Sequence, residues 1–235
     1  MTETITIIVQ TSTVARMLLL SFLSFLLSMA LTPFYTTVAY KYEWWKKQRS
    51  DSWSGGKATV YAKLHAAKHK GNIPNMAGIV FVIAISAVTL LLNLERRETW
   101  LPLAGMMGAG AIGFIDDWMN IRGSSKIAGM RAKVKFFLHS IVALIGGWWF
   151  WAKLDVTSLN FGFGEVALGS LVIILFWFVV IATANAVNIT DGLDGLAGGL
   201  LVSSFAVYTI IATVQGQYAL AGFCLTIVGA LLSYT

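Results

Sequence analysis

The sequence has little charge and almost no cysteine. Asp, Glu, Lys and Arg make up 12% of its 235 residues, whereas a soluble domain carries roughly 25%. Cys224 is the single cysteine and lies inside an apolar run, which excludes an internal disulfide framework or a thiolate metal cluster. The three histidines (His65, His69 and His139) show no metal-ligand spacing with an acid. These shortages exclude an ordinary soluble domain and a disulfide scaffold.

What the sequence has instead is apolar length. Hydrophobic residues make up 57% of the chain, and its mean hydropathy is +0.74. Helices satisfy every backbone polar group within lipid, so long apolar runs between short polar loops predict a polytopic all-α transmembrane bundle. We interpret residues 1–235 as a single integral-membrane domain. The expected spans are approximately 17–40, 76–94, 99–115, 136–152, 166–187, 196–214 and 219–234.

The basic residues are concentrated in alternate loops. Eight Lys and Arg residues lie between Lys41 and Lys70, and five lie between Arg122 and Lys135. The intervening loops hold only Arg96, Arg97 and Lys153. By the positive-inside rule, the rich loops face the cytoplasm and the N-terminus lies outside. The sequence thus predicts a multi-pass protein of a cytoplasmic membrane.

The third predicted span combines small residues with a terminal acidic pair. Gly105, Ala109 and Gly113 recur every fourth position, which predicts a face for close helix packing. The span is expected to end at Asp116 and Asp117. Because adjacent carboxylates repel, such a pair requires a divalent cation, a lysine or a shared proton nearby.

Lysines of both basic loops can complement these acids. The candidates are Lys68, Lys70, Lys126, Lys133 and Lys135. Carboxylates and lysines on one membrane face suggest a site for a phosphorylated substrate with Mg²⁺. There, cations neutralise phosphoryl oxygens and a carboxylate takes a proton from the nucleophile.

A second polar motif, at 185–199, separates two apolar runs. Asn185, Asn188, Asp191 and Asp194 recur every third position. On a continuous helix this stripe would rotate by about 60° at each step, so its ends would point apart. We expect the glycines at 192 and 195 to break the helix and let these side chains face one cavity.

The two motifs together resemble a known superfamily. Gly-Phe-Ile-Asp-Asp at 113–117, followed by a basic segment, and Asn-Ala-Val-Asn-Ile-Thr-Asp-Gly-Leu-Asp-Gly-Leu-Ala at 185–197 are similar to motifs of the polyprenyl-phosphate N-acetylhexosamine-1-phosphate transferases. The muramoyl-pentapeptide branch is the most similar, and Pro-Asn-Met-Ala-Gly at 74–78 supports it. The resemblance implies attack of polyprenyl (undecaprenyl) phosphate on a UDP-linked amino sugar, UDP-MurNAc-pentapeptide. UMP is released and a peptidoglycan precursor is formed at the bacterial inner membrane.

The resemblance also implies roles for individual residues. Asp116 and Asp117 would be catalytic, with Mg²⁺ as cofactor and Asp117 as a metal ligand. Asn185, Asn188, Asp191 and Asp194 would line the nucleotide pocket. Lys68 or Lys70, Lys126 and Lys135 would be basic substrate-binding positions. Dimers are known in the superfamily, so it also implies a homodimer.

Three departures from the superfamily pattern stand out. Asn120 replaces a usual lysine, with Arg122 as the candidate substitute. One extra residue before Pro74 leaves the matching lysine open between Lys68 and Lys70, and is similar to the N-acetylglucosamine-1-phosphate branch. The superfamily has about ten spans with a later metal-binding acid, so the resemblance implies that the chain is incomplete at its C-terminus.

Three alternatives to the muramoyl-pentapeptide reaction stay open. A UDP-N-acetylglucosamine-1-phosphate transferase for another surface polymer would share both motifs. An inactive fragment would result if the protein ended at Thr235. An ion-coupled transporter would place acids near mid-membrane, whereas here they lie at span ends. The position of the acids therefore favours a transferase over a transporter.

Overall fold

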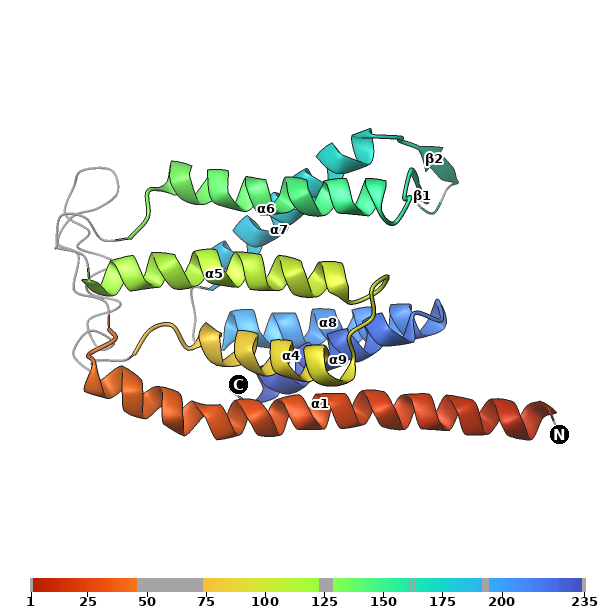
Figure 1. Cartoon of the computed structure of the whole chain (residues 1–235), viewed down its shortest axis with the longest axis horizontal. Coiled ribbons are helices and arrows are strands. Elements are labelled where there is room, and N and C mark those ends of the chain that lie inside the picture. Colours follow the sequence, from red (N-terminus) through yellow and green to blue (C-terminus); the bar gives the residue numbers. More distant parts are fainter. Residues whose placement is uncertain are drawn as a thin grey trace.

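The chain is an all-α membrane bundle, as the sequence predicts. The computed structural model describes residues 2–45, 74–122, 129–160, 162, 164–191 and 195–233, with side chains from residue 11 onward. Within these ranges the elements (Figure 1) are α1 (Thr2–Lys41), α4 (Gly78–Leu92), α5 (Trp100–Arg122), α6 (Ala132–Ala152), β1 (Ser158–Asn160), β2 (Glu165–Ala167), α7 (Leu171–Thr190), α8 (Leu196–Val214) and α9 (Tyr218–Leu232).

A helix lies in each of the seven predicted segments, but three of the helices are longer than predicted. Helix α1 already begins at Thr2, α5 continues to Arg122 rather than ending at 115, and α6 begins at Ala132 rather than at 136. Helix α7 begins only at Leu171, five residues later than predicted. The connection at 153–164, predicted as a plain loop, contributes to an antiparallel hairpin in which Leu159 pairs with Val166. Segment 11–41 of α1, α6, α7 and α8 are long and apolar enough to cross a membrane, and α4 and α9 are shorter apolar helices.

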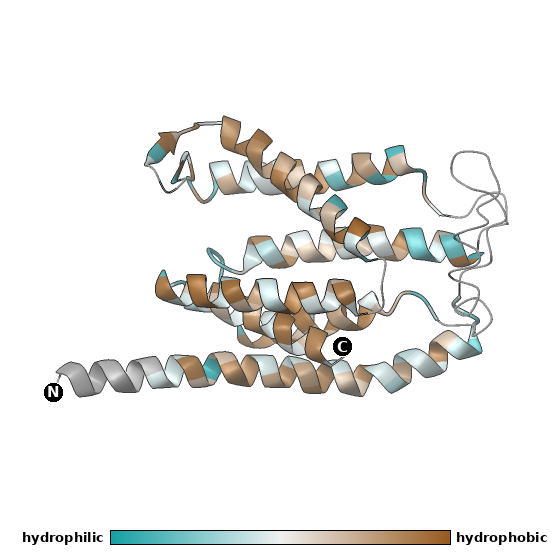
Figure 2. Cartoon of the chain, turned by 180° about the vertical axis from the view of Figure 1, so that it is seen from behind, coloured by the Kyte–Doolittle hydropathy of each residue, from teal (hydrophilic) through white to brown (hydrophobic). Residues whose placement is uncertain are grey.

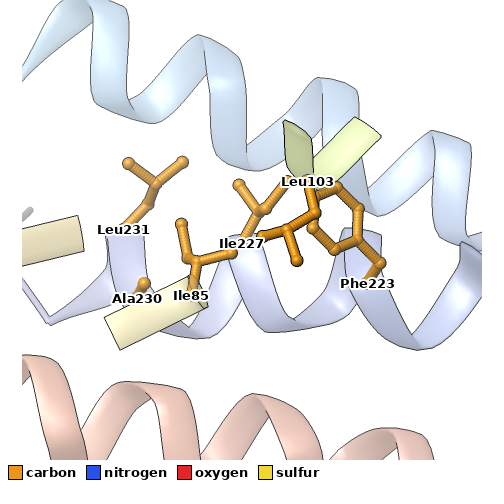
Figure 3. Packing of buried hydrophobic residues seen from close by; sticks show 6 residues of the cluster. All are labelled: Ile85, Leu103, Phe223, Ile227, Ala230 and Leu231. Atoms are coloured by element: carbon orange, nitrogen blue, oxygen red, sulfur yellow. The ribbon is translucent and has the colours of Figure 1, made fainter. Parts of the chain in front are cut away.

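Helix α9 forms the centre of the bundle. It packs against α1, α4 and α8, and every residue from Ala221 to Leu231 except Leu225 is buried. The main core cluster joins α9 to α4 and α5 (Figure 3); its members are Ile85, Leu103, Phe223, Ile227, Ala230 and Leu231. The last helix of the described chain is therefore the one against which α1, α4, α5 and α8 pack.

The closest helix approach lies between α1 and α9, at Gly229. A Cβ at this position would lie inside contact distance of the Ser21 carbonyl oxygen and 2.8 Å from the Ser21 carbonyl carbon. In the described structure no helix packs closely on the predicted face of α5, because no described atom lies within 4 Å of a Cβ built at Gly105 or Gly113. At other positions of α5, the Val142 side chain lies close to Gly108 and the Val82 side chain lies close to Gly110. These two glycines lie on other sides of the helix.

The outer surface is apolar, as expected for helices in contact with lipid. Large hydrophobic side chains on α7 and α8 are strongly exposed, among them Ile174, Phe178 and Ile210. Figure 2 shows hydrophobic residues along most helices and a hydrophilic stretch at the C-terminal turns of α5. This stretch is where the predicted acidic pair lies.

The helix ends that carry the two sequence motifs lie at one end of the bundle. The C-terminal ends of α1, α5 and α7 lie there, with the beginnings of α4, α6 and α8, while the hairpin and the α8–α9 turn lie at the other end (Figure 1). Lys41 and Arg122, which begin the two basic loops, thus share one end. Both sequence motifs therefore lie at the same end of the bundle.

Candidate functional site

The acidic pair lies inside α5 rather than at its end. Asp116 and Asp117 are followed by further helix up to Arg122. The Arg122 guanidinium lies 4.3 Å from the centre of the Trp118 ring, and Trp118 stacks on Phe114. A cation in the last turn also complements the helix dipole. These contacts extend the helix past the acids and explain why their predicted terminal position was wrong.

Asp116 is held by two donors from the next segment of the chain. Its Oδ1 accepts a hydrogen bond of 2.7 Å from the Met130 backbone N–H, and its Oδ2 accepts one of 2.7 Å from Lys135 Nζ. The Asp116 side chain is 14% exposed and that of Lys135 is 43% exposed. Because the lysine is partly hydrated, the pair stabilises the fold only modestly. Its main effect is to place one ammonium group beside the acidic pair, as the basic segment predicted.

Two further residues shape the contact between the end of α5 and the segment that leads into α6. Asn120 Nδ2 donates to the Asp116 carbonyl oxygen over 2.9 Å, one turn back along α5. Gly129 has φ of +79°, and a Cβ there would lie 2.5 Å from Asn120 Oδ1. Sequence reasoning identified Asn120 only as a departure from the superfamily and missed Gly129 and Met130. Of the two missed residues, only Gly129 could have been identified from the sequence, since a glycine before a helix often marks a turn.

The neighbours of this group have simpler roles. Asp117 is half-buried, and successive residues of a helix differ by about 100°, so its carboxylate diverges from that of Asp116. His139 lies in α6 as predicted, and its Nδ1 is 2.8 Å from the Lys135 carbonyl oxygen one turn earlier. This contact is local to the helix.

The second motif contains the predicted helix break. Helix α7 ends at Thr190, Asp191 is its C-cap, and α8 begins after Gly195, whose φ is +79°. Asn185, Asn188 and Asp191 are exposed. Asn185 Nδ2 donates to the Ile181 carbonyl oxygen over 2.9 Å, within its own helix. The motif is thus a helix end followed by a new helix start, with its polar side chains on the surface.

The structure brings the two motifs to the same end of the bundle. The two donors to the Asp116 carboxylate come from residues 130 and 135, and Asn185 donates within its own helix. Four predicted substrate-binding residues lie outside the described residues: Lys68, Lys70, Lys126 and Asp194.

A magnesium ion fits the donor chemistry only in part. No group of three or more His, Cys, Asp and Glu side chains forms a metal cluster among the described residues. However, Mg²⁺ in phosphoryl-transfer sites is commonly held by one or two carboxylates together with substrate phosphates and water. Both oxygens of Asp116 are already bonded to the protein, so the donors around Lys135 fit such an ion only in part.

These features define a helical membrane protein with acids, amides and a lysine gathered at one end of its bundle. Residues 99–235 match the family described as glycosyl transferase family 4, which is more than half of the chain. The chain belongs to this family.

Curated relatives extend the similarity to the N-terminal part. A phospho-N-acetylmuramoyl-pentapeptide-transferase of Geobacillus sp. (strain WCH70) is 30% identical over 231 residues, covering 93% of this chain and 65% of the relative. The protein of the same name from Chloroflexus aggregans is 31% identical, covering 94% of this chain and 60% of the relative. That from Lactobacillus helveticus is 34% identical, covering 70% and 52%. The chain therefore spans less than two thirds of the length of these relatives.

Proposed function

We propose that the complete protein transfers phospho-N-acetylmuramoyl-pentapeptide from its UDP-linked donor to a polyprenyl phosphate. The observation that carries this proposal is the Asp116–Lys135 pair beside Asp117, at the bundle end where the α7–α8 motif also lies. A site of this kind suits phosphoryl transfer, in which the protein mainly positions charges around a phosphorus atom. The names of the bacterial relatives support the same reaction.

The reaction exchanges one phosphoanhydride bond for another. An oxygen of the lipid phosphate forms a bond to the β-phosphorus of the donor. The bond from that phosphorus to the bridging oxygen breaks, and UMP leaves with this oxygen. When the lipid phosphate is protonated, the Asp117 carboxylate accepts the proton. Lys135 offsets the negative charge that the diphosphate brings, since its ammonium already lies beside the acids.

The polar groups of the second motif would bind the nucleotide. Asn185 and Asn188 offer both donors and acceptors for the uracil edge, and Asp191 is an acceptor for ribose hydroxyls. Asp117 would hold Mg²⁺, which supplies charge neutralisation at the diphosphate when bound. Since the basic residues at 41 and 122 share this end, the proposal places it in the cytoplasm, with the N-terminus of α1 outside.

The test measures UMP release by the complete protein from UDP-MurNAc-pentapeptide and undecaprenyl phosphate. We expect Asp117→Asn and Asp191→Asn to abolish release without loss of folding. Asp155→Asn is a matched control, because Asp155 has φ of +56° near the opposite end and Asn tolerates that conformation. Full activity of both site variants would contradict the site. Faster turnover with UDP-N-acetylglucosamine would instead identify the other branch of the superfamily.

A further inference from the structure

The corner between α5 and α6 depends on a close contact between Asn120 and Gly129. The three atoms nearest to a Cβ built at Gly129 all belong to the Asn120 side chain, at 2.5, 2.7 and 2.8 Å. Real Cβ atoms essentially never approach another atom this closely. Any side chain at position 129 would therefore push Asn120 aside or move the backbone away from α5.

Asn120 is itself fixed from the other direction. Its Nδ2 donates to the Asp116 carbonyl oxygen over 2.9 Å, and residues four apart on a helix lie on the same face. Asn120 thus stands directly above Asp116 on α5. Gly129, seated on Asn120, is followed at once by Met130, whose N–H donates to Asp116 Oδ1.

We propose that Asn120 and Gly129 are positioning residues for the acidic site. They hold the backbone entering α6 against α5, so that the Met130 N–H and the Lys135 ammonium both reach Asp116. Neither residue touches the reacting groups; both act by fixing where the Lys135 ammonium lies relative to Asp117. The kinetic part of this proposal rests on the proposed transferase function, whereas the contact itself does not.

The charge environment supports a positioning role rather than a phosphate-binding role for Asn120. The side chain is half-buried, its amide nitrogen is used by the Asp116 carbonyl oxygen, and its amide faces Gly129. Position 120, where the superfamily carries a lysine, therefore holds the neutral amide of Asn120, which contacts other residues of the protein. Among the described residues, Lys135 is the one that places an ammonium group next to Asp116.

The first experiment tests the contact by a double-mutant cycle in the complete protein. Gly129→Ala should lower kcat for UMP release by about tenfold or more, with a smaller change in KM for the UDP-linked donor. Adding Asn120→Ala removes the three clashing atoms, so the double variant should regain at least about threefold in kcat over Gly129→Ala. A double variant no more active than Gly129→Ala would overturn the proposal.

Gly216→Ala is the matched backbone control. Gly216 has φ of +74°, and no atom lies within 4 Å of a Cβ built there. It lies in the α8–α9 turn at the other end of the bundle. This variant carries the same left-handed strain without a clash, and it should keep the wild-type kcat. An equal loss of activity in both glycine variants would assign the effect to strain alone.

The second experiment tests the hydrogen bond of Asn120. Asn120→Ser keeps a donor that can reach the carbonyl oxygen one turn back, whereas Asn120→Asp has nearly the same shape but no donor when ionised. The serine variant should keep most of the activity, and the aspartate variant should lose it at unchanged KM. Wild-type activity in Asn120→Ala and Asn120→Asp would contradict the proposal.

The melting temperatures of the same variants separate this proposal from the transferase function. If the wild-type protein releases no UMP, the function is wrong, but the cycle can still be read from stability. The double variant should then melt above Gly129→Ala. If it does not, the contact itself is refuted.

Discussion

Gly229→Ala should destabilise the bundle at its closest helix contact. The added methyl group would overlap the Ser21 carbonyl oxygen and lie 2.8 Å from the carbonyl carbon. These are backbone atoms of α1, so no side-chain rotation relieves the overlap. Overpacking costs about 1–3 kcal/mol, and a rigid backbone neighbour places this site near the upper figure. Alanine regains about 1 kcal/mol in helix propensity, which leaves a net loss of about 2 kcal/mol.

Thermal unfolding of the purified protein in detergent measures this loss. For a chain of this size, about 2 kcal/mol corresponds to a decrease in Tm of roughly 4–8 °C. Gly105→Ala is the matched control, because a Cβ at that helical position meets no atom within 4 Å. It should raise Tm slightly. If Gly229→Ala were as stable as Gly105→Ala, the described α1–α9 packing would be refuted.

Two other predictions concern the opposite end of the bundle and the orientation in the membrane. Glu98 Oε2 accepts a hydrogen bond of 2.9 Å from the Leu220 N–H in the first turn of α9. Glu98→Ala should therefore lower stability by about 0.5–2 kcal/mol, measured as a decrease in Tm; an unchanged Tm would argue against this cap. In a Cys224→Ala background, Arg96→Cys should react with an impermeant maleimide from outside intact cells, and Arg131→Cys only after the membrane is opened. The reverse labelling pattern would invert the proposed orientation.

The helical architecture could be predicted because it depends on long apolar runs. The span predicted at 196–214 coincides with α8, and the predicted break near Gly195 separates α7 from α8. A glycine in the left-handed region is a local requirement that the sequence displays directly. Composition, apolar length and the position of Gly195 are local signals, and they were sufficient to predict these features.

Contacts between distant residues could not be predicted in the same way. The pattern indicated that a lysine should complement the acidic pair, but it could not select Lys135, which lies 19 positions after Asp116. Nor could it show that a backbone N–H, that of Met130, would take the other oxygen. The small-residue face on α5 illustrates the same point: regular spacing shows that a close helix approach is feasible, but not which neighbour makes it. The close approach instead occurs at Gly229.

The structure also distinguishes two acids that the sequence treats as equivalent. Adjacent carboxylates raise each other's free energy, and this repulsion must be offset by a cation or a proton. The ammonium of Lys135 and the N–H of Met130 both bind Asp116, so the compensation is built into the protein before any substrate arrives. Asp117, turned by about 100° around α5, presents its carboxylate in another direction. In the proposed reaction, Asp116 holds the Lys135 ammonium in place, and we propose that Asp117 meets the lipid phosphate and a magnesium ion.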